Sequence, residues 1–385
     1  MTPGRRTRIL IVDDSVVMRS LLRTVVSRDA GLEVAGTAAD GDAALRMIAS
    51  TQFDVVLLDV EMPVKDGLAT LRELKARGHR MPVIMCSSLT QRGASVTIEA
   101  LACGASDYVA KPSGQSGREA ATEALAQDLI PKIQALTGQA QAGIAGSGLA
   151  PGLGMGAGAM RFPPALAGLP PLKSHPMTGT PVVLVIGVST GGPAALDVLL
   201  PALPGDFPLP VLIVQHMPEV FTGLFAERLN GRCRLRVREG AEGEAVRAGT
   251  IYIARGNWHM EVLAASRAGS PPTLHLSQGP LENHCRPAAD VLFRSAAGVY
   301  GAGVLAVVLT GMGSDGMLGC RAIREEKGGV LAQDQASSTV WGMPGAVANG
   351  GLANRIVPLN AMAAEIQRVV SRKSSEAGEL RERAV

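Results

Sequence analysis

The sequence predicts an α/β protein that contains two doubly wound parallel-sheet domains. Residues 1–136 and 180–372 each alternate short apolar runs with segments of helical periodicity, which is the pattern of repeated strand–helix units. A Gly-, Ala- and Pro-rich stretch over 137–179 separates them and is predicted to be a flexible linker. Polar residues that carry chemistry follow several apolar runs directly, at the strand ends where parallel sheets bind ligands.

The composition is that of a globular protein with substantial cores. The 385 residues are 46% hydrophobic and 18% charged, and their number suggests two or three domains. The net charge of +3 is small for this length, so a nucleic-acid partner is not expected. The five cysteines are scattered and form no C-x-x-C pair, which argues against a disulfide framework or a zinc site and fits a reducing compartment.

Targeting and membrane signals are weak. The apolar run near the N-terminus stops at Asp13 and is too short for the core of a signal peptide. No later run reaches the ~18 uncharged residues of a membrane span. We therefore expect a cytoplasmic protein that does not insert directly into a membrane.

The first domain contains runs that are typical of buried parallel strands. These are "RILIV", "DVVLLD", "PVIMCS" and "DYVAK", and segments such as "SVVMRSLLRTVVS" between them have helical periodicity. Asp13 and Asp14 follow the first run, and Asp59 ends the second. In an open parallel sheet these three carboxylates converge at one edge, where a hard cation such as Mg²⁺ would join them.

Two further strand ends of this domain carry suitable chemistry. Ser87 closes "PVIMCS" and Lys111 stands in "VAKP", so they could offer a hydroxyl and a cation to a phosphoryl group. The alternative for Asp13 and Asp14 is that they cap the following helix, as Asp commonly does at such junctions. The joint pattern, with polar residues after each strand, favours the ligand site.

The second domain repeats the alternation of strands and helices. Its strand-like runs are "PVVLVIGVS", "LPVLIVQHM", "TIYIA", "GVLAVVLTG" and "GGVLAQD". The middle, "RLRVREGAEGEAVRAGTIYIARGNWHMEVL", is more typical of short antiparallel strands and turns than of another strand–helix unit. The charged segment over 373–385 is predicted to be a disordered tail.

Ser189 is the first candidate for chemistry in this domain. Gly187, Ser189 and Gly191 satisfy the G-x-S-x-G pattern of a nucleophile elbow, in which a sharp turn after a strand exposes the hydroxyl. The motif alone supports a helix cap equally well. Because a neutral serine hydroxyl is a weak nucleophile, a catalytic role requires a base within hydrogen-bond reach.

Six histidines could supply that base. His216 ends the run "LIVQH" in the next strand–helix unit after Ser189, and adjacent parallel strands bring their ends to the same edge. His259 and His284 lie in turn-rich segments and stay possible. The remaining histidines are poorly placed, because they lie in the first domain, the linker and a strand-like run: His79, His175 and His275.

A carboxylate must hold the tautomer of the imidazole and stabilise its charged form, and Asp315 is preferred for this role. It follows the strand "GVLAVVLT", whereas Asp290 lies in a helical segment and Asp334 ends another strand. The same loop, from Gly311 to Gly316, also satisfies the G-x-G-x-x-G pattern of dinucleotide-binding proteins. That alternative is weaker, because the pattern comes late rather than in the first strand–helix unit of the domain.

The first domain resembles the receiver domain of bacterial response regulators over roughly its whole length, on "DD", "LLDVEMPVKDG", "SS" and "KP". The resemblance implies a flavodoxin-like fold that a sensor histidine kinase phosphorylates with the help of Mg²⁺. It also implies the following roles: Asp59 as phosphoacceptor, Asp13 and Asp14 with Asp59 as Mg²⁺ ligands, Ser87 as switch hydroxyl, Tyr108 as switch aromatic residue, and Lys111 as a contact of the phosphoryl group.

The second domain resembles the catalytic domain of the chemotaxis protein-glutamate methylesterases. The match covers nearly all of 181–370 and rests on "IGVSTGGP", "QHMP", "FAERLN", "YIARGNWHME", "RPAADVLF", "LTGMGSDG" and "GMPGAV". It implies a Rossmann-like domain with an antiparallel hairpin region, in which Ser189 is the nucleophile, His216 the general base and Asp315 the orienter. Met312 matches the position whose backbone amide helps to form the oxyanion hole.

Two features depart from the pattern of that family. The linker is longer and more Gly-rich than the usual connector, and Val188 stands where alanine is often found. The longer linker bears on how tightly the receiver domain docks on the active site. The second is a small change beside the nucleophile, and we expect it to be tolerated.

The resemblance implies an enzyme of chemosensory adaptation at membrane-bound receptor arrays. It would hydrolyse glutamate γ-methyl esters, and deamidate glutamines, on the cytoplasmic domains of methylated chemoreceptors. The esterase reaction needs no cofactor, because Mg²⁺ serves the receiver alone. Two other classes stay open from the residues, a non-enzymatic signalling adaptor and a dinucleotide-dependent enzyme. A transcription factor is not expected, since no basic recognition segment is found.

Overall fold

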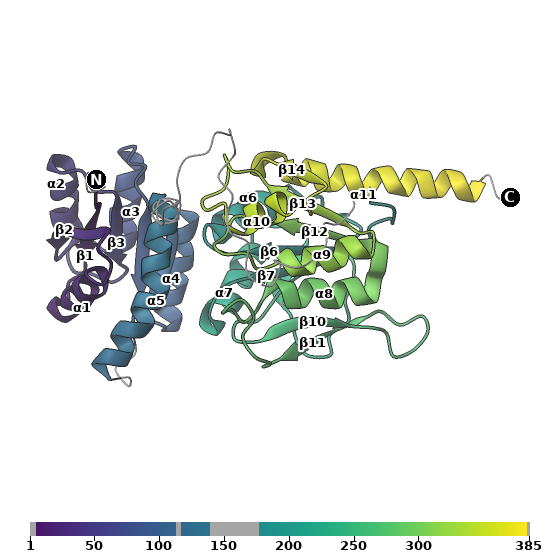
Figure 1. The fold of residues 1–385 in the computed structure, drawn as a ribbon, viewed down its shortest axis with the longest axis horizontal. Coiled ribbons are helices and arrows are strands. Elements are labelled where there is room, and N and C mark those ends of the chain that lie inside the picture. Colours follow the sequence, from purple (N-terminus) through teal and green to yellow (C-terminus); the bar gives the residue numbers. More distant parts are fainter. Residues whose placement is uncertain (1–4, 113–116, 139–176, 383–385) are drawn as a thin grey trace, which may run out of the picture. The chain divides into compact units, whose positions relative to one another are not determined.

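The computed structural model describes residues 5–112, 117–138 and 177–382, and the chain divides into two compact units, Met1–Pro151 and Gly152–Val385 (Figure 1). Most of the linker predicted over 137–179 lies outside the described residues. Within the described ranges, no helix combines the length and the apolar character needed to cross a membrane.

The N-terminal unit is a five-stranded parallel sheet in the order β2-β1-β3-β4-β5, as the sequence predicts for a flavodoxin-like domain (Figure 1). Its elements are β1 Thr7–Val12, α1 Val16–Val26, β2 Leu32–Ala38, α2 Gly41–Ser50, β3 Val55–Asp59, α3 Gly67–Ala76, β4 Val83–Ser87, α4 Gln91–Ala102, β5 Asp107–Ala110 and α5 Arg118–Thr137. The edge strand β2 is mostly half-buried, and for this reason it lacks the continuous apolar run that marks the other four strands.

Several helices of this unit begin at a side chain that accepts a hydrogen bond from the helix backbone. Ser15 caps α1, Asp66 caps α3 and Thr90 caps α4, and each satisfies an N–H group that the helix itself leaves unpaired. The helix-cap alternative for Asp13 and Asp14 is therefore wrong. Both carboxylates lie ahead of the cap, where β1 ends.

The C-terminal unit is built on a seven-stranded sheet in the order β14-β13-β12-β6-β7-β9-β8, in which neighbouring strands pair in parallel. Strands β10 and β11 form a separate antiparallel hairpin, so the Rossmann-like fold with a hairpin region is confirmed. The strands are β6 Val183–Val188, β7 Val211–Gln215, β8 Arg236–Glu239, β9 Thr250–Ile253, β10 His259–Leu263, β11 Thr273–Ser277, β12 Val304–Val308, β13 Gly329–Gln333 and β14 Arg355–Val357.

The helices of this unit pack the central strands into one core. They are α6 Gly192–Leu199, α7 Glu219–Asn230, α8 Ala289–Tyr300, α9 Met317–Glu325, α10 Met343–Asn349 and α11 Leu359–Glu382. Strands β12, β6 and β7 are buried along their whole length. Leu212, Phe293 and Val304 belong to one hydrophobic cluster, in which α8 joins the sheet. This packing fixes the carboxyl ends of the three central strands side by side.

Two parts of this unit differ from the sequence prediction. The sequence predicts antiparallel strands over 234–263, but β8 and β9 pair in parallel and extend the main sheet. Between β8 and β9 the chain turns at Gly243 and Gly249, both with positive φ. It therefore enters β9 in the same direction as β8 without an intervening helix. The tail over 373–385 is predicted to be disordered, but α11 continues to Glu382, because Glu, Ala, Leu and Arg favour helix. Residues 383–385 lie outside the described part.

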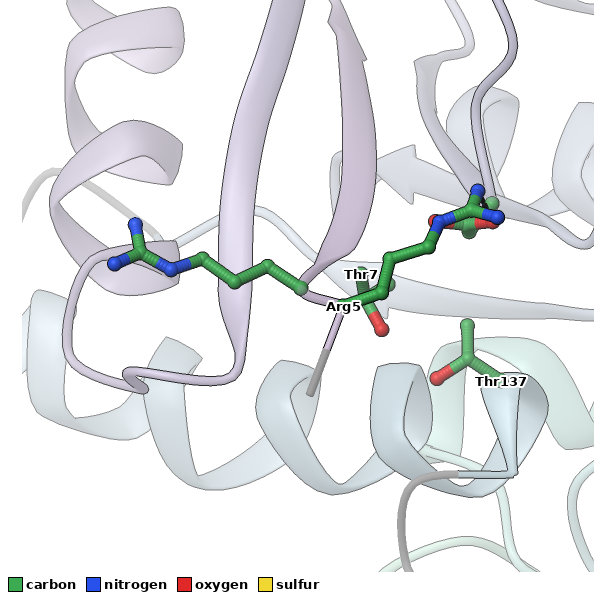
Figure 2. A pocket seen from close by; sticks show the side chains of 5 residues that line it. Arg5, Thr7 and Thr137 are labelled. Carbon is green, nitrogen blue, oxygen red and sulfur yellow. Dashed lines mark hydrogen bonds and ion pairs between the residues drawn. The ribbon is translucent and has the colours of Figure 1, made fainter. Parts of the chain in front are cut away.

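A cavity of about 330 Å³ lies at the amino ends of β1 and β3 (Figure 2). It is lined by Arg5, Arg6, Thr7, Asp54 and Thr137. Arg5 donates to Asp54 at 2.9 Å across it, an ion pair that is largely exposed and therefore weak. Because ligands of parallel sheets bind at the carboxyl ends of strands, this cavity is separate from the predicted carboxylate site.

We predict that Gly67→Ala destabilises the N-terminal unit. A Cβ at this position would lie 2.0 Å from the carbonyl oxygen of Asp59, so the end of β3 or the start of α3 would have to move. Overpacking of this kind lowers the free energy of unfolding by about 1–3 kcal/mol. Urea unfolding followed by circular dichroism measures the difference.

Gly223→Ala in α7 is the matched control for this substitution. A Cβ on Gly223 meets no atom within 4 Å, and alanine favours a helix, so we expect unchanged or slightly higher stability. A Gly67→Ala protein as stable as the unchanged chain would contradict the close approach of α3 to Asp59.

Candidate functional site

The carboxylates predicted for the first domain meet at the carboxyl edge of its sheet. Asp13 follows β1 and Asp59 ends the neighbouring strand β3. One ligand oxygen from each, and one from Asp14, lie within 4.8 Å of one another. Lys111 follows β5, and its Nζ lies 2.8 Å from Asp13 Oδ2 and 2.7 Å from Asp59 Oδ1. The residues that follow three different strands therefore share one site.

Burial and the lysine together set the charges of this cluster. Asp13 and Asp59 are 0% and 3% exposed. Burial raises the pKa of Asp59, and the ion pair with Lys111 opposes this rise. Burial acts to lower the pKa of Lys111, but its contacts with Asp13 and Asp59 raise it overall. Lys111 is therefore charged at neutral pH and offsets part of the negative charge of the two carboxylates.

The donor set of this cluster fits a Mg²⁺ ion. Asp13 Oδ2 is buried and accepts no hydrogen bond within the described residues, although it forms an ion pair with Lys111. Asp14 is exposed and can reach the same point from the solvent side. Carboxylate oxygens beside open solvent are the ligands that Mg²⁺ prefers, because this ion keeps several waters.

Ser87 and Tyr108 lie on the neighbouring strands β4 and β5. The hydroxyl of Ser87 donates to Ser88 O at 3.1 Å, and the Lys111 N–H donates to Ser87 O at 2.7 Å. Tyr108 is buried, and Lys132 Nζ lies 5.3 Å from the centre of its ring. In this conformation neither the Ser87 nor the Tyr108 side chain makes one of these contacts with Asp59. Their roles as switch residues stay predictions.

Ser189 lies directly after β6, near the middle of the C-terminal sheet. Gly191, with φ +77°, precedes α6, and the N–H of Gly192 donates to Ser189 O at 2.7 Å. A Cβ on Gly311 would lie 2.8 Å from Ser189 Cβ, so the loop after β12 lies against the serine. The strand, sharp turn and helix expected of a nucleophile elbow are therefore present.

His216 and Asp315 follow the two strands that flank β6. β7 ends one residue before His216 and pairs with β6 on one side, while β12 pairs with it on the other. His216 Nε2 lies 2.7 Å from Asp315 Oδ2. Two residues that are far apart in sequence thus form a bond at the edge of the sheet, as the strand-end argument predicts.

The carboxylate of Asp315 is buried and surrounded by donors. The N–H groups of Ala289, Asp290 and Gly316 donate to it at 2.6, 3.0 and 2.9 Å, and Asn283 Nδ2 donates at 2.8 Å. Burial acts to raise the pKa of Asp315, but the bonds with the imidazole and with the backbone N–H groups lower it overall. Asp315 is therefore ionised over a wide pH range.

The imidazole of His216 is held at both nitrogens. Nε2 contacts Asp315, and Nδ1 lies 3.5 Å from Cys285 Sγ. Burial acts to lower the pKa of His216, but hydrogen bonds with Asp315 and Cys285 raise it to about 10. Among the described contacts, the Ser189 hydroxyl makes no hydrogen bond with His216. The structure thus joins His216 to Asp315, while Ser189 lies at the end of the strand between theirs.

Other candidates from the sequence have structural contacts. His259 in β10 is buried, and its Nε2 lies 2.9 Å from Pro280 O. His275 pairs with an exposed glutamate at 3.1 Å. Asp334 accepts from Ser337 N at 3.1 Å, within a turn. None of the three contacts Ser189 or its neighbours in the part of the chain that the structure describes.

The glycine loop after β12 packs against α10 and carries Asp315. Gly311 O accepts from the N–H groups of Gly342 and Met343 at 3.0 and 2.9 Å, and this fixes the loop against α10. Asp315 is engaged by His216, which favours the predicted orienting role over that of a ribose ligand. The N–H of Met312 donates to no acceptor among the described residues, and Met312 follows Gly311, the residue that packs against the serine.

Comparisons with known proteins assign each of the two units to a known family. Residues 9–123 match the response regulator receiver domain, and residues 184–366 match the CheB methylesterase domain. The protein-glutamate methylesterase/protein-glutamine glutaminase of Trichodesmium erythraeum is 45% identical over 94% of this chain and 98% of its own length. The chain belongs to this family. Its relative of the same name in Nocardioides sp. is 46% identical over 95% of this chain and 96% of that one.

The crystal structure of the Thermotoga maritima CheB methylesterase catalytic domain is also similar to part of the chain, at 36% identity and a TM-score of 0.47, and covers 50% of this chain and 99% of that one. Membership of the CheB methylesterase family confirms three predictions from the sequence. These are the family itself, the two-domain α/β fold and the class of the enzyme, a hydrolase. It favours an enzyme over a non-enzymatic adaptor.

Three further residues near the site of this CheB-family chain were not predicted from its sequence. Gln215 Nε2 donates to both Ser189 O and His216 O at 3.1 Å, and so ties the two strand ends together. Cys285 and Asn283 reach the site from a turn between the hairpin and α8. Gln215 was detectable as a polar residue that ends a buried strand, but "ENHC" carries no such signal.

We predict that the ring of His216 titrates far above the usual histidine pKa of about 6.5. In Asp315→Asn the neutral amide no longer favours the imidazolium, and burial then lowers the pKa of His216. The raised pKa means that this pair contributes stability fully below about pH 6.5 and loses it as pH rises through about 10. NMR titration of the ring C–H resonances measures both proteins.

Ser189→Ala is the control for this titration, because it removes no charge and no hydrogen bond to the ring. We expect its His216 pKa to match that of the unchanged chain. An equal pKa in Asp315→Asn would contradict the coupling between the two residues.

Proposed function

We propose that the chain hydrolyses glutamate γ-methyl esters on methylated chemoreceptor cytoplasmic domains and deamidates glutamines there, under the control of receiver phosphorylation. The observation that carries this proposal is the meeting of Ser189, His216 and Asp315 at the ends of three adjacent strands, in a chain of the CheB methylesterase family. Its curated relatives are named for both activities.

In the proposed reaction, His216 in its neutral form takes the proton of the Ser189 hydroxyl, and the serine oxygen attacks the ester carbonyl. Because the pKa of His216 is raised to about 10, this form is the minor one at neutral pH, and the rate is expected to rise with pH. The imidazolium then protonates the methoxy group, which leaves as methanol, and water releases the glutamate by the reverse sequence. Asp315 holds Nε2–H, so Nδ1, which lies 3.5 Å from Cys285 Sγ in this structure, is the nitrogen left to accept the serine proton. The Ser189 hydroxyl has to come within reach of Nδ1 when substrate binds, since catalytic hydrogen bonds commonly tighten in the complex.

The negative charge that develops on the carbonyl oxygen needs a donor. The unpaired N–H of Met312, in the loop that packs against Ser189, is the donor that the geometry favours. Such preorganised donors contribute about 10²–10³-fold in rate. The same arrangement serves an amide carbonyl, with ammonia as the leaving group, so glutamine deamidation needs no additional residue and neither reaction needs a cofactor.

Regulation of this activity is assigned to the first domain. Asp59 accepts the phosphoryl group from a sensor histidine kinase and Lys111 contacts it, while Asp13, Asp14 and Asp59 would hold Mg²⁺. The bound ion would offset the charge of the phosphoryl oxygens. Ser87 and Tyr108 then act as switch residues. The site of action is the cytoplasmic side of the receptor arrays.

We predict that Ser189→Ala lowers methanol release from methylated receptor membranes by about 10⁴-fold or more, because the nucleophile is lost. Gas chromatography of the released methanol measures the rate. Ser270→Ala, in the exposed turn between β10 and β11, is the control and keeps the rate. Undiminished release by the Ser189→Ala protein would rule out the proposed triad.

We predict that acetyl phosphate with Mg²⁺ raises the rate of methanol release by roughly 5- to 150-fold, the usual range of allosteric coupling. Asp59→Asn abolishes this increase and keeps the basal rate, because an amide accepts no phosphoryl group. Removal of Mg²⁺ with EDTA has the same effect. Asp54→Asn, at the other end of β3, is the matched control and stays responsive. A phosphodonor response in Asp59→Asn would refute the regulatory assignment.

A further inference from the structure

We propose that Asn283 is a positioning residue that fixes the carboxylate of Asp315 for its bond to His216. The inference rests on the proposed function and adds a residue to the same site. The amide of Asn283 lies between two buried carboxylates, with Nδ2 2.8 Å from Asp315 Oδ1 and 2.9 Å from Asp290 Oδ2. An amide nitrogen has two hydrogens, so one can bind each carboxylate.

The two carboxylates need such a donor between them. Asp315 and Asp290 are 2% and 1% exposed, and like charges that are buried side by side repel one another. Burial and the charge of Asp315 raise the pKa of Asp290 to about 7. Gly319 N donates to the other oxygen of Asp290 at 2.6 Å. With Asn283 in place, both oxygens of Asp290 have donors, and Asp290 stays beside Asp315 without displacing it.

The bond from Asn283 also sets the rotation of the Asp315 carboxylate. Oδ1 accepts from Asn283 Nδ2 and from the N–H groups of Asp290 and Gly316. Oδ2 accepts from the N–H of Ala289 at 2.6 Å and lies 2.7 Å from His216 Nε2. The backbone donors belong to the loop and to α8, whereas Asn283 supplies the one side-chain donor to Oδ1 among the described residues.

The turn that carries Asn283 is held in place for this contact. Asn283 and His284 have φ of +52° and +62°, a region that non-glycine residues seldom adopt and in which Asn is enriched. Glu282 and Cys285 close the turn with backbone bonds of 3.1 and 2.8 Å. The carboxylate of Glu282 also accepts from both terminal nitrogens of Arg294 in α8, at 2.5 and 2.6 Å. The turn is thus anchored on the helix that begins beside Asp315.

The test compares kcat and KM for methanol release in three full-length variants. Asn283→Gly keeps the left-handed backbone without strain and removes the amide. Asn283→Asp keeps the shape of the side chain, but an ionised carboxylate cannot donate. His284→Gly relaxes the neighbouring residue of the same turn, whose exposed side chain makes no hydrogen bond within the described residues, and is the matched control.

We expect kcat to fall about tenfold or more in both Asn283 variants, since a hydrogen bond to a charged group is lost, while KM changes less than about twofold. His284→Gly keeps both constants. Wild-type kcat in Asn283→Gly would overturn the proposal. An equal loss in His284→Gly would also overturn it, because the shape of the turn would then matter rather than the amide.

A readout that needs no esterase activity separates this proposal from the proposed function. The Nε2–H of His216 that is shared with Asp315 gives a low-field proton resonance in ¹⁵N-edited NMR. We expect it to persist in His284→Gly and to shift or broaden in Asn283→Gly, and an unchanged resonance in the latter would refute the positioning role. If Ser189→Ala retained methanol release, the proposed function would fail while this result would still decide the role of Asn283.

Discussion

Parallel strands of a sheet end at a common edge, and both candidate sites of this chain depend on that constraint. In the N-terminal unit the ends of β1, β3 and β5 place Lys111 Nζ within 3 Å of both Asp13 and Asp59. In the C-terminal unit β12, β6 and β7 bring an aspartate, a serine and a histidine to one edge, where His216 Nε2 and Asp315 Oδ2 lie 2.7 Å apart. The register of the strands therefore determines which residues meet, and the loops that follow determine how the side chains are directed.

The two units stabilise their buried carboxylates by different means. In the first, the charge of Lys111 offsets Asp13 and Asp59, and Oδ2 of Asp13 accepts no hydrogen bond from the residues that the structure describes. In the second, backbone N–H groups and an amide surround Asp315. Burying a charge is costly unless it is paired or hydrogen-bonded. The first arrangement leaves room for a cation and a new anionic group, whereas the second is complete and suits a fixed orienter.

The sequence predicts the parts of the molecule that follow from strand position and fails where side chains arrive from elsewhere. Asp59, His216 and Asp315 each follow a buried apolar run, and such runs are visible without a structure. Strands β2 and β8 contain few buried residues, so neither appears in the sequence as a continuous apolar run. Asn283 and Cys285 reach the imidazole pair from a left-handed turn, whose direction depends on tertiary packing against α8.

The packing of Gly311 against Ser189 has a consequence for engineering this chain. A Cβ at position 311 would lie 2.4 Å from Met343 Sδ and 2.8 Å from Ser189 Cβ, so a side chain there would have to displace one of them. A library intended to change substrate preference should hold this position constant and vary residues on the open side of the site. A larger residue at position 311 would shift the backbone or side chain of Ser189, so a gain in specificity made there would come with a displaced serine.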